Sequence, residues 1–569
     1  MNTLLIALAQ LNTTVGDLQG NADRIHRCAE DAAAQGARLV VFPELALSGY
    51  PPEDLVLKHR FITDCEEALT QLAATLPPDL VAVVGAPCRI ENTVRNTAVV
   101  LAQGTIHARY SKMLLPNYGV FDEKRHFSPG ETGLILELNG LRIGIHICED
   151  SWFPEKTPTR LLQQAGLDAL INLSASPYFR RKLSVRELTL AQTARQLNAS
   201  LFYCNLIGGQ DELVFDGASL IFDREGQLIA RASQFREELI LHTLNSPKRT
   251  NASIPPALQR VEINVPETSA PLHTAPLHPT LPEMEEIYQA LMTGLRDYVD
   301  KNGFKRVVVA LSGGIDSALV LILAVDALGA DRVAAVTMPS RFTSDGTLSD
   351  ADAMAKGLDI EFLTIPIKDL HDQYLHQLTP YWPDREPDAT EENLQARIRG
   401  NIIMALSNKF GWLVLTTGNK SEMATGYCTL YGDMAGGFAV IKDVPKTLVF
   451  ELCRWRNGQS ATPVIPPSII TRPPSAELRD DQKDSDSLPP YDLLDTIIEN
   501  YVELDRSIQE IIQQNLDPET VKRVVRLIDL NEYKRRQGPP GIKITPKSFG
   551  RDRRMPITNR YGRPTPPTP

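Results

Sequence analysis

The chain has 569 residues, of which 43% are hydrophobic and 23% are charged, and its formal net charge is -11. This length exceeds the roughly 300 residues that one hydrophobic core usually organises, and the composition is typical of globular proteins, so we expect two domains. The negative charge argues against a general nucleic-acid binder. Seven cysteines without a C-x-x-C pair argue against a disulfide framework or a zinc site and fit a reducing cytoplasm.

The first residues, 1–10, form an apolar run without the basic leader of a signal peptide, so we interpret them as a first strand. No apolar run approaches the roughly 20 residues that span a bilayer. We therefore expect a protein that is neither exported nor embedded in a membrane.

Residues 1–245 contain many short apolar runs and few long helical patterns, which predicts a layered α/β sandwich. The best strand candidates are 4–9, 39–42, 80–85, 98–101, 142–148, 169–173 and 201–206, and the best helix candidates are 22–35 and 182–197.

Three reactive side chains follow predicted strands in this region. Glu44 follows Phe-Pro, Lys112 follows Tyr-Ser, and Cys148 follows Gly-Ile-His-Ile. A thiolate nucleophile needs a base that takes its proton and a cation that stabilises the oxyanion, so these three residues form a chemically complete set. Each residue alone is weak evidence, because an isolated cysteine is usually a small buried hydrophobe.

Three segments follow one another in the chain: Pro-Glu44, then Lys112-x-x-Leu-Pro-Asn-Tyr-Gly-Val-Phe-Asp-Glu123, then Ile-Cys148-Glu-Asp. In this order they resemble the nitrilase, or carbon-nitrogen hydrolase, family over about 245 residues. They look like the glutaminase domain of glutamine-dependent synthetases. That resemblance implies an α-β-β-α sandwich in which Glu44 is the base, Lys112 the oxyanion stabiliser and Cys148 the nucleophile. It also implies a supporting role for Glu123 and glutamine contacts for Tyr118, Ser176 and Lys182.

Residues 246–282 are rich in proline, which interrupts helices, and we expect a linker there. A helix at 283–300 then leads to the second domain, which we place at 283–550.

A buried strand is predicted from residue 306, a sharp turn at Ser312-Gly313-Gly314, and a helix at 315–328 that begins Ile315-Asp316-Ser317. The two glycines let a ligand approach the backbone amides, and the helix dipole favours an anion. The turn is not a Walker loop, because no lysine follows the glycines. A carboxylate beside phosphate requires a divalent cation between them. The turn resembles the pyrophosphate loop of ATP pyrophosphatases; the alternative is that Asp316 and Ser317 only cap the helix.

Strands at 332–338, 360–365 and 412–416 alternate with helices at 348–357 and 391–410, which predicts a doubly wound parallel sheet with ligands at the carboxyl ends of its strands. At such ends, Met338 is a candidate neighbour of adenine and Thr417 supplies a hydroxyl for ATP. Glu422 offers a second carboxylate that could hold magnesium together with Asp316.

The segment 312–317 and the segments 391–400, 416–438, 443–447 and 531–536 together closely resemble the corresponding parts of the NAD synthetases. The resemblance implies ATP- and magnesium-dependent adenylation of deamido-NAD, release of pyrophosphate, and displacement of AMP by ammonia from glutamine. It also implies an ammonia tunnel and a homo-oligomer. The residues expected to contact deamido-NAD are Asn393, Glu422, Asp433 and Lys534.

An alternative function is a nitrilase-type amidase fused to a nucleotide sensor that has lost turnover; the intact pair Asp316 and Glu422 argues against it. The glutaminases of enzymes that make GMP or asparagine use other nucleophile arrangements, and residue 2 here is Asn. Residues 473–490 are expected to form a mobile loop or lid, and the basic, proline-rich residues 551–569 a solvated tail.

Overall fold

The computed structural model describes residues 2–246, 254–266 and 271–561. Contacts divide the chain into two compact units, Met1–Thr293 and Gly294–Pro569, and the boundary falls within helix α6 (Glu283–Lys301). The predicted linker and tail lie partly outside the described residues. None of the described helices is both long enough and apolar enough to cross a membrane.

The first unit contains two large sheets. In the described residues the first sheet has the order β14-β1-β2-β3-β4-β5, and the second has the order β13-β12-β9-β8-β7-β6-β15. The first sheet comprises β1 (Asn2–Gln10), β2 (Leu39–Val41), β3 (Val81–Ile90), β4 (Thr93–Ala102), β5 (Thr105–Ser111) and β14 (Glu238–Ser246). The second comprises β6 (Gly133–Leu138), β7 (Leu141–Ile147), β8 (Ala169–Ser174), β9 (Ser200–Asn205), β12 (Leu220–Phe222), β13 (Leu228–Arg231) and β15 (Leu258–Ile263), and a separate hairpin joins β10 (Ile207–Gln210) to β11 (Leu213–Asp216).

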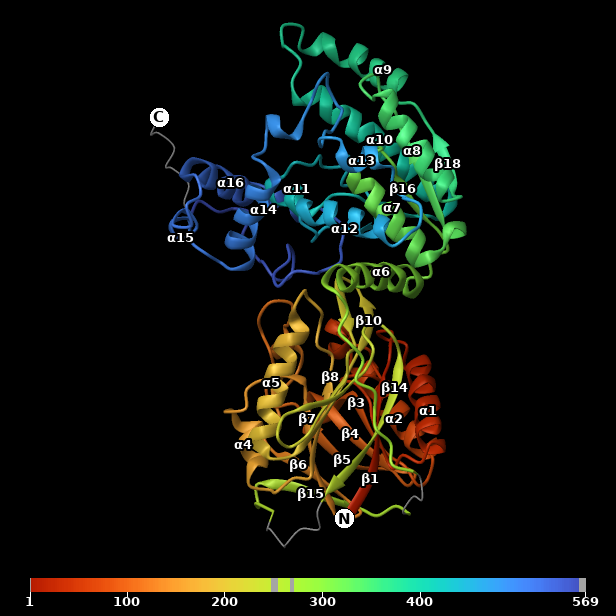
Figure 1. The fold of residues 1–569 in the computed structure, drawn as a ribbon, viewed down its shortest axis with the longest axis vertical. Coiled ribbons are helices and arrows are strands. Elements are labelled where there is room, and N and C mark those ends of the chain that lie inside the picture. The colour runs from red at the N-terminus through yellow and green to blue at the C-terminus, as the bar shows by residue number, and fades with distance from the viewer. Residues whose placement is uncertain (1, 247–253, 267–270, 562–569) are drawn as a thin grey trace. The chain divides into compact units, whose positions relative to one another are not determined.

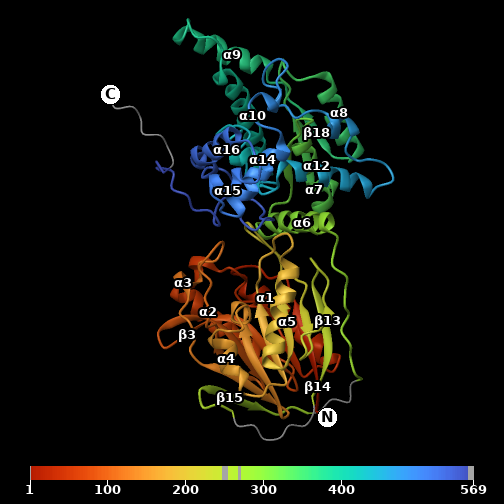
Figure 2. The same ribbon diagram turned by 60° about the vertical axis from the view of Figure 1, so that its left-hand side comes forward.

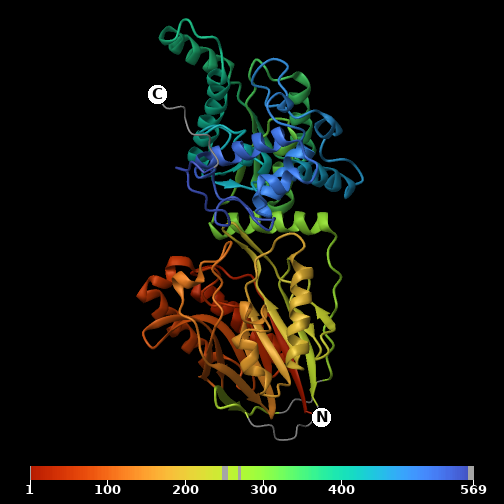
Figure 3. The same cartoon turned by 90° about the vertical axis from the view of Figure 1, so that its left-hand side faces the viewer.

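These sheets pack face to face between two layers of helices. Helices α1 (Leu18–Ala34) and α2 (His59–Thr75) cover the outer face of the first sheet, and α4 (Thr157–Gln163) and α5 (Lys182–Leu197) cover the second (Figures 1 and 3). Successive residues of β1 alternate between the layers: Ile6 lies in the core between the sheets, and Leu5 lies under the helices. The predicted α-β-β-α sandwich is confirmed.

Strand β15 lies within the segment that the sequence suggested as a linker. It pairs in parallel with β6, and Ile263 and Val265 join the core between the sheets. Part of the proline-rich segment therefore completes the first unit, which its high proline content did not indicate.

The second unit is built on a parallel sheet with the order β18-β17-β16-β19-β20 in the described residues. Its strands are β16 (Val307–Ala310), β17 (Val333–Thr337), β18 (Glu361–Thr364), β19 (Leu413–Thr416) and β20 (Phe438–Ala439), and the helices around it are α7 (Ile315–Leu328), α8 (Asp345–Gly357), α9 (Lys368–Leu378) and α10 (Ala389–Phe410). The predicted doubly wound sheet is confirmed. The strand order reverses between β16 and β19, which is where such sheets bind ligands.

A helical subdomain follows the sheet. It contains α11 (Lys420–Thr425), α12 (Lys446–Gly458), α13 (Pro467–Thr471), α14 (Tyr491–Ile498), α15 (Ile508–Ile512), α16 (Pro518–Leu530) and α17 (Glu532–Arg535). Figure 2 shows α14, α15 and α16 grouped together, and their apolar residues form one core with Met423 and Ala424 of α11. Arg553, expected in a solvated tail, is buried against Asp529 and the ring of Tyr501.

Candidate active sites

Cys148 stands at the sharp turn that follows strand β7. Its φ of +42° lies in the left-handed region, which is uncommon for a residue other than glycine. The side chain is only 4% exposed, and the Asn172 amide donates to the Cys148 carbonyl at 3.2 Å. Backbone strain of this kind persists where the surrounding structure enforces it, as it does at many reactive residues.

Lys112 lies between two carboxylates in a fully buried position. Its Nζ atom is 2.7 Å from Glu44 Oε1 and 2.8 Å from Glu123 Oε1. Burial by itself would lower the pKa of Lys112, but the charges of Glu123 and Glu44 raise the pKa well above its usual value. Burial also raises the pKa of Glu123 to about 7, against the opposing effect of Lys112. The carboxyl groups of Glu44 and Glu123 therefore favour the charged, ammonium form of Lys112.

The carboxylate of Glu44 is held by further donors. The Asn96 amide donates to Oε1 at 2.7 Å, and the backbone N–H of Ala175 donates to Oε2 at 3.0 Å. Burial and the negative charge of Glu44 raise the pKa of the Cys148 thiol, although Lys112 opposes them. The resting nucleophile is consequently a neutral thiol, which needs a base such as Glu44 during attack.

The three predicted glutamine contacts lie in different environments. Tyr118 donates its hydroxyl to Glu149 Oε1 at 2.9 Å, and Lys182 donates to the Pro177 carbonyl at 2.7 Å. Ser176 Oγ is buried and has no hydrogen-bond partner among the described residues. Sequence reasoning assigned no role to Glu149, although it directly follows Cys148.

A cavity of about 810 Å³ opens in the second unit at the carboxyl ends of β16, β17 and β19. All of the residues predicted to bind ATP, metal or deamido-NAD line it, namely Ser312, Gly313, Gly314, Ile315, Asp316, Ser317, Met338, Asn393, Thr417, Glu422, Asp433 and Lys534. The structure thus brings residues from distant parts of the chain to one site.

The turn between β16 and α7 requires glycine. Gly313 has a φ of +82°, and a Cβ atom there would lie 2.4 Å from the carbonyl oxygen of Thr347. Within the turn, Gly314 N–H donates to Ser312 Oγ at 3.2 Å, and Ser317 Oγ donates to the Gly314 carbonyl at 2.9 Å. The turn is therefore closed on itself and faces the cavity.

Asp316 and Glu422 both contact Lys446, to which sequence reasoning gave no role. Lys446 Nζ pairs with Asp316 Oδ2 at 2.5 Å and lies 3.6 Å from Glu422 Oε1. Asn419 donates to the other oxygen of Asp316 at 2.8 Å. Burial and the charge of Asp316 raise the pKa of Glu422 to about 8, although Lys446 opposes them. One ammonium thus faces two carboxyl groups, and the nearby Asp316 is part of what disfavours ionisation of Glu422.

A divalent cation beside Asp316 and Glu422 would allow both carboxyl groups to ionise. Asp484, from the segment expected to form a lid, also lines the cavity and adds its charge to those of Asp316 and Glu422. Within the described residues, no group of three or more His, Cys, Asp or Glu side chains is arranged to hold a metal by itself. A cation held by Asp316 and Glu422 would thus need other ligands, such as phosphate oxygens.

The residues predicted to bind deamido-NAD meet at the loop after α11. Asn393 Oδ1 accepts from the Thr429 hydroxyl at 2.8 Å, and Asp433 Oδ1 accepts from the Thr429 N–H at 2.7 Å. Lys534 donates to the carbonyls of Gly426 and Cys428 at 2.7 and 2.8 Å. These side chains shape one wall of the cavity.

Comparison with known proteins accounts for both units. The carbon-nitrogen hydrolase family matches residues 5–252, and the NAD synthase family matches residues 287–538. The glutamine-dependent NAD(+) synthetase of Thermotoga maritima is 46% identical over 99% of this chain and 100% of its own length. That of Acinetobacter baylyi is 46% identical over 99% of each chain. The chain belongs to the glutamine-dependent NAD(+) synthetases.

Solved structures of this family agree with that assignment. The glutamine-dependent NAD+ synthetase from Acinetobacter baumannii in complex with ADP is 42% identical, with a TM-score of 0.76 over 99% of this chain and 100% of that one. The glutamine-dependent NAD(+) synthetase from Cytophaga hutchinsonii, 23% identical, shares the fold with a TM-score of 0.80 over 98% of each chain.

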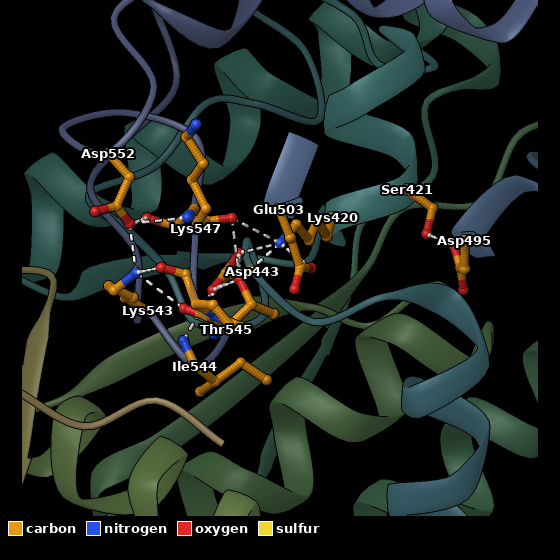
Figure 4. Close-up of polar contacts among 12 residues, drawn as sticks. Lys420, Ser421, Asp443, Asp495, Glu503, Lys543, Ile544, Thr545, Lys547 and Asp552 are labelled. Carbon is orange, nitrogen blue, oxygen red and sulfur yellow. Dashed lines mark hydrogen bonds and ion pairs between the residues drawn. The ribbon is translucent and has the colours of Figure 1, made fainter. Parts of the chain in front are cut away.

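In the second unit a buried ionic network holds α11, which carries Glu422. Lys420 Nζ contacts Asp443 Oδ1 at 2.9 Å, Glu503 Oε1 at 2.7 Å and Thr545 Oγ1 at 2.7 Å (Figure 4). Lys420 is completely buried. Because Lys420 lies between Asn419 and Glu422 in the chain, the network fixes the backbone that presents both residues to Asp316 and Lys446.

We expect Lys420→Met to lower the free energy of unfolding of the second unit by about 3 to 5 kcal/mol, because Asp443 and Glu503 would remain buried without their cation. Urea denaturation followed by circular dichroism measures this change. The control is Lys356→Met, whose exposed pair with Asp352 should contribute less than about 1 kcal/mol. Equal effects of the two variants would contradict a structural role of the network.

Proposed function

We propose that this chain amidates deamido-NAD to NAD at the expense of ATP, with ammonia released from glutamine in the first unit. The observation that carries the proposal is the combination of Glu44, Lys112 and Cys148 in one unit with a cavity in the other that collects the turn 312–317 and the pair Asp316 and Glu422. The named relatives support the same pair of activities.

In the first unit, Glu44 takes the proton from the Cys148 thiol as the sulfur attacks the glutamine amide carbon. Lys112 donates a hydrogen bond to the oxyanion that forms. Glu44 then returns the proton to the departing ammonia, and water hydrolyses the thioester to glutamate with Glu44 as base again. The close hydrogen bond between Lys112 and Glu44 supports this division of roles.

In the second unit, the nicotinate carboxylate of deamido-NAD attacks the α-phosphorus of ATP, and pyrophosphate leaves. The amides and hydroxyls of the turn at 312–317 hold the pyrophosphate, and Lys446 offsets part of its charge. Magnesium, held by Asp316 and Glu422, would neutralise the remaining phosphate charge. Ammonia then attacks the acyl carbon, and AMP leaves with the electrons of the broken C–O bond.

The test is to supply the wild-type protein with ATP, magnesium, deamido-NAD and either glutamine or an ammonium salt. We expect NAD, AMP and pyrophosphate in equal amounts with both nitrogen donors. Hydrolysis of glutamine without pyrophosphate release would favour an amidase fused to a nucleotide sensor.

The family resemblance also supports a cytoplasmic homo-oligomer, and light scattering after size-exclusion chromatography measures its mass.

We expect Lys534→Ala to raise the apparent KM for deamido-NAD about tenfold or more while changing the KM for ATP little. Lys534 orders the wall formed by Gly426 and Cys428, and a hydrogen bond from a charged donor contributes enough to produce such a shift. Steady-state kinetics with ammonium as donor measure both constants. Lys522→Ala, at an exposed helix position, is the control. An equal rise in both constants would contradict the assignment.

A further inference from the structure

One face of helix α10 lines the cavity in the second unit. The cavity-lining residues Asn393, Ala396, Arg399 and Ile403 recur at intervals of three or four, with Gly400 beside Arg399, which places them on one side of the helix. Asn393 is the only one of them to which the sequence gave a role. Glu392 also lines the cavity near the start of the helix, whereas Arg399 is the cation of this face and lies nearer the middle of the helix.

Arg399 differs from the other cations around the cavity. Lys446, Arg472 and Arg479 form ion pairs with carboxylates, whereas Lys534 supports backbone carbonyls. Among the described residues, Arg399 has no carboxylate within ion-pairing distance, and its Nε atom donates to the Met338 carbonyl at 3.0 Å. Its remaining donor groups, on Nη1 and Nη2, therefore lack an anionic partner.

The environment of Arg399 is unfavourable for an uncompensated cation. Burial lowers its pKa to about 10, and the charge of Glu477 opposes this effect only in part. The side chain remains protonated near neutral pH. Arg399 is partly buried, and a guanidinium that has lost part of its hydration gains more from an anionic ligand than one in water does.

The hydrogen bond to Met338 fixes where the guanidinium lies. Met338 directly follows strand β17, and Leu311 and Ser312 directly follow strand β16. The Leu311 N–H donates to the carbonyl of Val336 in β17 at 2.9 Å, so the ends of the two strands lie side by side. Neighbouring strands are about 5 Å apart, so Arg399 stands at the seam between the turn at 312–317 and the predicted adenine position. In ATP, the α-phosphate joins the adenosine to the pyrophosphate.

We propose that Arg399 binds the α-phosphate of ATP. This inference rests on the proposed function, in which the turn holds the two phosphates that leave and Met338 borders the base. The α-phosphate then needs a donor of its own, and Arg399 is oriented for that purpose by the Met338 carbonyl. Negative charge grows on the equatorial oxygens of this phosphate as the nicotinate oxygen attacks, so the same contact assists adenylation.

The test compares Arg399→Met with wild type by isothermal titration calorimetry of the full chain, using adenosine, AMP and magnesium-ATP as ligands. We expect the affinities for AMP and ATP to fall about 10- to 100-fold and the affinity for adenosine to change little. Arg399→Lys should recover part of the loss. Arg456→Met, which removes an arginine paired with Asp326 outside the cavity, is the matched control and should leave all three affinities unchanged.

An equal loss of affinity for adenosine would overturn the proposal, because it would mean that Arg399 contacts the base or ribose. Unchanged binding of AMP and ATP would overturn it as well, as would a variant defective only in the KM for deamido-NAD. These outcomes differ from failure of the proposed function, which would show as wild-type protein that releases no pyrophosphate from ATP and deamido-NAD.

Discussion

Cys148→Ala is expected to lose glutamine-dependent NAD formation by about a thousandfold or more and to keep the rate supported by ammonium salts. Cys148 supplies the nucleophile, and neither Glu44 nor Lys112 can replace a thiol. The adenylate formed in the second unit reacts with ammonia from any source. The measurement is the ratio of glutamine-supported to ammonium-supported NAD formation, and the ammonium-supported rate should rise with pH as NH3 replaces NH4+.

Cys88→Ala is the matched control, because Cys88 is a second buried thiol of the same unit whose pKa is raised to about 11 by burial. It should keep both rates.

Glu44→Gln should lose the glutamine-supported rate nearly as completely as Cys148→Ala, since Glu44, Lys112 and Cys148 act as one unit. If Cys148→Ala still used glutamine, the assignment of the first unit would be wrong; loss of both rates would show that the two activities are not separable.

Asp316→Asn is expected to reduce NAD formation by about a thousandfold or more with either nitrogen donor. The substitution keeps the size of the side chain and removes the charge that would hold magnesium against the pyrophosphate. It also leaves Lys446 without its nearest partner. Pyrophosphate release from ATP and deamido-NAD measures this effect directly, and glutaminase activity of the first unit should persist.

The control for that variant is Asp326→Asn, on the same helix but paired with Arg456. It changes charge by the same amount outside the cavity, and we expect near-normal rates. A fivefold excess of magnesium should not rescue Asp316→Asn if the carboxylate is a ligand. Near-normal NAD formation by Asp316→Asn would contradict the metal assignment.

Several elements could be predicted closely because their signals are local. The helix predicted at 182–197 has the bounds of α5, and the helix predicted to begin at Ile315 is α7. The close backbone approach predicted at Gly313 is explained by the structure, since only glycine accepts its backbone angle and the nearby Thr347 carbonyl. Helix α2 was missed, and so was strand β15, whose proline-rich surroundings gave no strand pattern.

The sequence by itself determined the chemistry offered by each unit, because strand ends, turns and the residue types after them are properties of short segments. The tertiary structure alone decided which charges meet: Lys446 reaches Asp316 across 130 residues, and Lys420 reaches Glu503 across 83. It also decided that Arg399 has no carboxylate partner within ion-pairing distance among the described residues. Such contacts leave no periodic pattern in the chain, because they depend on how the sheet, its helices and the helical subdomain pack, and packing is set by many distant residues together.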